Sequence, residues 1–86
     1  MSVSKREAKQ RLGEVMSALE IVLTGALEGD FELQSKVRAC ARVGWCSLEL
    51  ATAIIEATEV GGNVDLVELR KRRFEEALGQ FTIYGP

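Results

Sequence analysis

One stretch decides the fold: residues 31–60, FELQSKVRACARVGWCSLELATAIIEATEV. Plotted at about 100° per residue, its apolar side chains fall on two adjacent lines. The first line holds Leu33, Val37, Cys40, Gly44, Leu48, Ala51 and Ile55, and the second holds Ala39, Val43, Cys46, Leu50, Ile54 and Ala57. Together they form an apolar arc of about 240°, and a helix that apolar must be covered on several sides. The stretch predicts the central helix of an all-α protein.

Gly44 is the weak point of this helix, because a glycine inside a helix costs about 1 kcal/mol relative to alanine. A break there would let Ser47 cap a new helix and would give four helices in place of three. The two apolar lines, however, keep the same phase on both sides of Gly44, and a true break would normally reset it. We therefore expect a continuous helix in which Gly44 allows another backbone to approach closely.

A first helix is predicted from about Ser4 to Leu27, although Gly25 could end it earlier. Ser4-Lys-Arg-Glu7 has the spacing of a capping box, and apolar residues three and four apart follow it. A short turn of residues 28–30 connects this helix to the long one, and the aspartate that closes the turn can cap the long helix. A connection this short makes the two helices antiparallel neighbours.

A shorter third helix is predicted from about Val64 to Leu78. Gly-Gly-Asn at residues 61–63 separates it from the long helix, either Asn63 or Asp65 can cap it, and a glycine follows its end. The last segment, Phe81 to Pro86, has a strand-like composition but is too short for a sheet, so we expect a docking tail or a frayed end. The sequence thus predicts a single helical domain over residues 1–86, a long antiparallel hairpin with the third helix folded back as a three-helix bundle.

Composition excludes several classes of protein. The hydrophobic fraction of 47% fits a globular chain, and a net charge of −2 argues against a dedicated nucleic-acid binder, which usually carries a basic excess. No apolar run approaches the roughly 20 residues that span a bilayer, and the N-terminus lacks the apolar core of a signal peptide. We expect a cytoplasmic protein without a membrane segment.

The residues that carry catalysis are missing from the sequence. It contains no histidine, which removes the commonest general base and the commonest metal ligand. It has no glycine-rich phosphate loop, no cluster of metal ligands and no nucleophile elbow. Cys40 and Cys46 point about 120° apart on one helix, which predicts two buried thiols rather than a disulfide. The sequence therefore predicts neither an enzyme nor a cofactor or metal site.

The best candidate for a binding surface is the narrow polar strip of the long helix. It carries Gln34, Arg38, Arg42, Glu49, Thr52, Glu56 and Glu59, with Trp45 at its edge. A tryptophan between an arginine and a glutamate has the composition of an interaction hot spot. The candidate partner-binding residues are therefore Trp45, Arg38, Arg42 and Glu49. The alternative is that the third helix or the tail covers Trp45, which would make it part of the core.

Arg70 is a fifth candidate. It begins the run Arg70-Lys-Arg-Arg73, whose members point in four directions about 100° apart and so cannot form one basic face. Arg70 itself projects into the apolar arc of the third helix. Either its stem packs and its guanidinium reaches solvent, or it pairs with a carboxylate across an interface.

The long helix needs more cover than the other two predicted helices supply. Its arc of about 240° faces two stripes of about 140° each, which leaves Ile21, Cys46 and Ala53 partly uncovered. The sequence therefore predicts a homodimer or a heterocomplex. In an antiparallel dimer, the basic end of the polar strip, at Arg38 and Arg42, would meet the acidic end, at Glu49 and Glu56, of the second chain.

These observations predict a small non-catalytic protein-binding module of the adaptor, small-chaperone or phage-inhibitor type. It would act by steric occlusion or by holding a protein partner. The alternative is a nucleic-acid-associated small helical dimer, a regulator or a packaging component, in which dimerisation gathers the arginines and lysines of the first and third helices on one surface.

Overall fold

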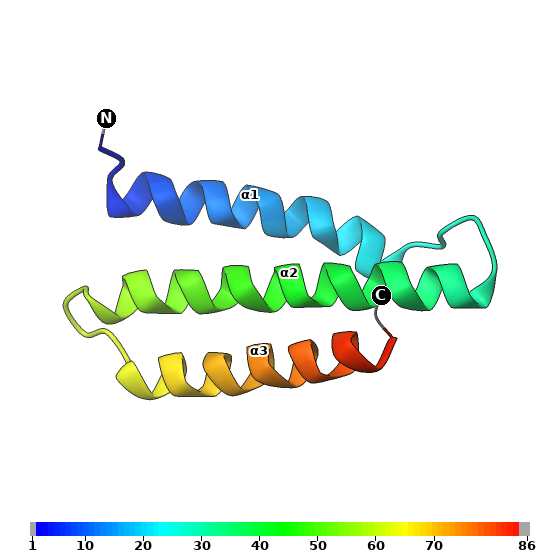
Figure 1. Ribbon diagram of the computed structural model, residues 1–86. Helices are drawn as coiled ribbons and strands as arrows, with labels where there is room; N and C mark the ends of the chain where they lie inside the picture. The colour runs from blue at the N-terminus through cyan, green and yellow to red at the C-terminus, as the bar shows by residue number, and fades with distance from the viewer. Residues whose placement is uncertain (1, 85–86) are drawn as a thin grey trace.

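The computed structural model describes the backbone of residues 2–84 and the side chains of residues 2–81. This part of the chain forms three α-helices, α1 (Lys5–Thr24), α2 (Phe31–Ala57) and α3 (Val64–Tyr84), and contains no strand. The predicted all-α hairpin with a third helix folded back is confirmed. α2 runs between α1 and α3 and is antiparallel to both (Figure 1).

Each helix begins at a side-chain cap that the sequence predicts. The pairs are Ser4 Oγ with the Glu7 N–H (3.1 Å), Asp30 Oδ1 with the Leu33 N–H (2.8 Å) and Asn63 Oδ1 with the Leu66 N–H (3.3 Å). Each oxygen accepts a hydrogen bond from an amide that has no partner inside its helix, and such a cap stabilises a helix by about 1 kcal/mol. Directly before the cap of α2, Gly29 adopts a positive φ of 134°.

The long helix is continuous through Gly44, as predicted. A Cβ atom on Gly44 would lie 3.4 Å from Cδ1 of Leu19, so α1 passes close to α2 at this point. α2 ends at Ala57, whereas the sequence predicts its end at Val60. The reason is a tightened last turn, in which the N–H of Thr58 donates to the Ile55 carbonyl at 3.1 Å, and Thr58 Oγ1 donates to the same carbonyl at 2.6 Å.

The predicted ends of the outer helices differ from the observed ones. α1 ends at Thr24 because Gly25 turns to an extended conformation, the earlier of the two predicted ends. The predicted end of α3 at Leu78 is wrong, because the helix continues to Tyr84 and takes up most of the expected tail. Phe81 extends the inner stripe of α3 by another turn, and its packing offsets the roughly 1 kcal/mol cost of the intervening Gly79. Residues 85–86 of the expected tail lie outside the described residues.

The three helices form an open bundle. In the described chain, no Cα atom of α1 lies within 8 Å of a Cα atom of α3. The molecule measures 46 × 24 × 23 Å, and its radius of gyration is 14.7 Å, compared with about 12 Å for a compact domain of this length. Within residues 2–84, no helix is both long enough and apolar enough to cross a membrane.

The core is thin and consists of small side chains. Among the side chains described, the buried apolar residues are Ala41, Cys46, Ala53 and Ala77, and no large side chain is fully buried. Gly44, which faces α1, and Cys46, which is buried near Arg70 and Arg73 of α3, lie about 160° apart around α2. α1 and α3 therefore cover nearly opposite sides of α2, and two further sides stay open.

Candidate functional site

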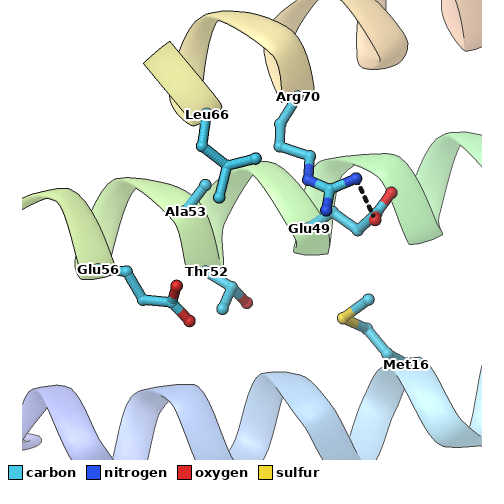
Figure 2. Close-up of a pocket in the computed structure, with 7 residues that line it drawn as sticks. All are labelled: Met16, Glu49, Thr52, Ala53, Glu56, Leu66 and Arg70. Carbon is cyan, nitrogen blue, oxygen red and sulfur yellow. Dashed lines mark ion pairs between the residues drawn. The ribbon is translucent and has the colours of Figure 1, made fainter. Parts of the chain in front are cut away.

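One open side of α2 is a charged groove with α1 and α3 as its walls. We define the polar face by the α2 residues Arg38, Arg42, Trp45, Glu49, Thr52 and Glu56. A hollow of about 180 Å³ lies over it, lined by Met16, Glu49, Thr52, Ala53, Glu56, Leu66 and Arg70 (Figure 2). Met16 comes from α1 and Leu66 from α3, and both reach toward the groove (Figure 2). The groove thus has an apolar side chain on each wall, Arg70 on the α3 wall and a mainly polar floor.

Glu49, on the α2 floor of the groove, forms ion pairs with two arginines of α3. Its Oε2 atom lies 2.9 Å from Nη1 of Arg70 and 3.7 Å from Nη1 of Arg73, and its side chain is 14% exposed. The other carboxylate oxygen is buried without a hydrogen-bond partner among the described residues. Arg70 does pair with a carboxylate across an interface, but the interface is the one between α2 and α3 of the same chain. The two arginines therefore set the position of α3 along α2.

Arg38 connects α2 to the other wall of the groove, α1. Its Nη2 atom donates a hydrogen bond of 2.6 Å to the carbonyl of Gly25, directly after the end of α1. A cation is favourable at a helix C-terminus because the last carbonyls carry partial negative charge and have no partner in the helix. At the far end of α1, Lys9 Nζ lies 2.9 Å from Glu59 Oε1. Both ends of α1 are therefore tied to the α2 segment.

The structure divides the five predicted site residues into two groups. Arg38, Glu49 and Arg70 are held by partners within the chain. Trp45 is half-buried, so it is neither a core residue nor a fully exposed one, and Arg42 is exposed. Arg42 has no ion pair within the described residues. Of the five, Trp45 and Arg42 remain open to a partner on this face.

The predicted antiparallel dimer contact uses four charged residues of the polar strip, Arg38, Arg42, Glu49 and Glu56. Two of them, Arg38 and Glu49, already have partners within the chain. Of the four, only Arg42 and Glu56 are exposed and without an ion pair in the described part of the chain. Exposed ion pairs contribute about 0–1 kcal/mol each, so two symmetric Arg42–Glu56 pairs would add little to the stability of a dimer. The charges of this face are better suited to selecting a partner than to holding two copies together.

The second open side of α2 was not predicted from the sequence. We define the apolar face by Leu33, Cys40, Val43, Ser47 and Ile54 of α2, which lie about 160° from the polar face, together with Leu78 and Phe81 of α3. Leu33 is 47% exposed and Ile54 50%. A hollow of about 160 Å³ is lined by Cys40, Val43, Leu78 and Phe81. No other helix of the chain covers this side of α2 in the described residues.

The prediction of which residues stay uncovered is partly wrong. Ile21 is 73% exposed, as expected, but Cys46 and Ala53 are buried on the side of α2 that faces α3. The prediction of two buried thiols holds for Cys46 and fails for Cys40, which is exposed, and both thiols are free. Burial raises the pKa of the Cys46 thiol, and the nearby Glu49 raises it further against the opposing effect of the surrounding arginines.

A signal for the apolar face is present in the sequence. Between Val37 and Ile55 the chain has three charged residues, Arg38, Arg42 and Glu49. All three fall within about 40° of one another on the polar face. The opposite face is therefore free of charge over five helical turns. The charge-free sector, rather than the width of the apolar arc, marks the uncovered side.

The basic run of α3 is split by the fold. Arg70 and Arg73 point to Glu49, whereas Lys71 and Arg72 are exposed. In residues 2–81, no group of three or more Cys, Asp or Glu side chains is placed to hold a metal ion. No protein-family model, curated protein or solved structure matches the chain.

Proposed function

We propose that this protein is a small, non-catalytic protein-binding module of the cytosol, which holds or occludes a protein partner along its polar face. The proposal rests on one observation: ion pairs and a hydrogen bond hold the helices on both sides of the groove, while the side chains of Trp45, Arg42 and Glu56 have no partner of this kind in the described residues. Arg70 and Arg73 fix α3 through Glu49, and Arg38 fixes the end of α1. A groove fixed before binding loses less conformational entropy when the partner arrives.

The groove defines the chemistry of its partner. Arg42 and Glu56 lie on one strip of α2, about 21 Å apart at 1.5 Å per residue, with the hollow between Met16 and Leu66 close to the Glu56 end. A segment that fits carries an acidic side chain facing Arg42, a basic one facing Glu56 and an aliphatic one that enters the hollow. An amphipathic helix of about four turns has this length and these faces.

Alanine at Arg42 or at Trp45 is expected to weaken partner binding. For Trp45 we expect a loss of about 30-fold, because aromatic anchors at the centre of an interface contribute about 2 kcal/mol or more. For Arg42 we expect about tenfold. The measurement is capture of proteins from an extract of the source cells on the immobilised wild type and variants, quantified by mass spectrometry, followed by titration with the purified partner.

The matched control is Arg72→Ala, because Arg72 is an exposed helical arginine directed away from α2. The proposal requires one protein that the wild type and Arg72→Ala retain equally and that both polar-face variants lose. Equal retention by all four chains would refute the polar face as the binding surface. A large fall in the melting temperature of Trp45→Ala would instead place Trp45 in the core and leave Arg42→Ala as the deciding variant.

The alternative function, a nucleic-acid-associated dimer, has less support from the side-chain arrangement. Arg70, Arg73, Lys9, Arg11 and Lys36 each lie within ion-pair distance of a carboxylate. These pairs reduce the positive charge available to phosphates. Retention of duplex DNA that falls steeply with added salt would favour this alternative, since release of counterions makes phosphate contacts salt-sensitive.

A further inference from the structure

The chain has a larger solvent-accessible surface than a compact monomeric protein of the same mass. Its accessible surface is 6304 Å² for a mass of 9.4 kDa. A compact monomer of that mass exposes about 5,000 Å², so the surplus is about 1,300 Å². A stable protein–protein interface buries about 800 Å² on each partner, and homodimers often bury more. The surplus is sufficient for one such interface.

The apolar face is the surface best suited to such a protein–protein interface. Between Val37 and Ile55, none of the α2 side chains on this face is charged. Leu33 and Ile54, at its two ends, are about half exposed. Its hollow, lined by Cys40 and Val43 of α2 and by two residues of α3, is bordered by apolar area only. Between Val37 and Ile55, burial of this face would gain roughly 25 cal/mol per Å² of apolar surface without desolvating a charge. Near its Leu33 end, the exposed ion pair of Lys36 with Glu32, at 3.2 Å, would lie at the edge of the interface.

We propose that a second copy of this chain covers the apolar face and that the protein is a homodimer with α2 antiparallel to α2. A two-fold interface places the same patch on both partners, so the patch must be complementary to itself when reversed. Leu33, Cys40, Ser47 and Ile54 recur every seven residues along the apolar face. The stripe has large aliphatic side chains at both ends and small ones in the middle.

Reversal of this stripe about its midpoint superposes like residues. Leu33 of one copy then meets Ile54 of the other, and Cys40 meets Ser47. The small side chains in the middle, next to Gly44, allow the two α2 backbones to approach closely. The hollow beside Cys40 receives an aliphatic side chain of the second copy. This symmetry about the centre distinguishes a second copy from an unrelated partner, which would need no such pattern.

The dimer leaves both polar faces outward and about 160° away from the shared interface around α2. Self-association and partner binding thus use different residues, and either can fail without the other. An Arg42→Ala chain remains dimeric, whereas a chain altered on the apolar face keeps its polar groove.

Sedimentation equilibrium over about two decades of protein concentration tests the dimer. We expect the wild type to sediment at twice the monomer mass of 9.4 kDa. Ile54→Glu should sediment as a monomer, with its dissociation constant raised at least about 100-fold, because the interface contains two copies of the buried charge. Ile21→Glu is the matched control, since Ile21 is a more exposed isoleucine on the far side of α1, and it should remain dimeric.

A wild type that stays at 9.4 kDa throughout the series would overturn the proposal, as would a dimer that survives Ile54→Glu. Leu33→Glu is the second variant in case Ile54→Glu loses helical circular dichroism, and it should give the same monomer. A monomeric wild type that binds a different protein through Ile54 would also overturn the second copy as occupant, while partner binding through Arg42 would be unaffected.

Discussion

Replacing Glu49 with alanine is expected to lower the free energy of unfolding by about 2 kcal/mol. The carboxylate accepts from Arg70 at 2.9 Å and lies 3.7 Å from Arg73, and its side chain is 14% exposed. Its removal leaves two guanidinium groups against α2 without a counter-charge. A fully buried pair broken in this way costs about 3–5 kcal/mol, and the partial exposure of both arginines reduces that figure through solvent screening.

Thermal unfolding of Glu49→Ala at a fixed protein concentration measures this effect. For a chain of this size, 2 kcal/mol corresponds to a fall of about 8–16 °C in melting temperature. The matched control is Glu56→Ala, which removes an exposed glutamate from the same helix and is expected to change stability by less than about 0.5 kcal/mol. Equal effects of the two substitutions would show that the Glu49 pairs do not hold α3 in place.

Replacing Ala77 with leucine is expected to destabilise the protein by about 2 kcal/mol through overpacking. Ala77 of α3 is 4% exposed, and Cys46 on the facing side of α2 is 3% exposed. Small buried side chains on both helices set the separation of α2 and α3, so three added carbon atoms must push the helices apart. The same displacement would lengthen the contacts of Arg70 and Arg73 with Glu49.

Chemical denaturation of Ala77→Leu and of the control Ala18→Leu measures this effect. Ala18 is exposed on α1, so leucine there adds apolar surface to solvent without crowding a neighbour. We expect the control to stay within about 0.5 kcal/mol of the wild type. If Ala77→Leu is as stable as Ala18→Leu, the alanine contacts do not fix the distance between α2 and α3.

Local signals in the sequence account for the helix boundaries that were predicted correctly. Ser4, Asp30 and Asn63 act within three residues of their own position, so their role as caps depends on little else. The continuity of α2 through Gly44 follows from the unchanged phase of the apolar lines. The end of α3 was missed because the packing of Phe81 against another helix outweighs the local cost of a glycine.

The sides of α2 that stay open could not be predicted from the width of its apolar arc. A helical wheel gives the direction of each side chain but not the neighbour that lies in that direction. The arc width predicted that the chain's own helices leave Cys46 partly uncovered. Cys46 is buried, because the pairing of Arg70 and Arg73 with Glu49 brings α3 to that side. The open apolar side is indicated instead by the sector of α2 without charged residues, opposite Arg38, Arg42 and Glu49.

The central claim is that α2 is covered on two opposite sides by its own chain and on the third by a second copy. The two native thiols test it, because Cys46 faces α3 and Cys40 lies on the apolar face. Burial and a raised pKa make the Cys46 thiol slow to react, whereas Cys40 is open in the single chain. Brief alkylation followed by intact-mass spectrometry counts the thiols that react.

For the monomeric Ile54→Glu chain and for dilute wild type, we predict one adduct per chain, located on Cys40. For concentrated wild type we predict that this adduct is lost as the second copy covers Cys40. Two adducts in the folded monomer would contradict the placement of α3 over Cys46. A Cys40 adduct that forms at the same rate at every concentration of the wild type would contradict the covered apolar face.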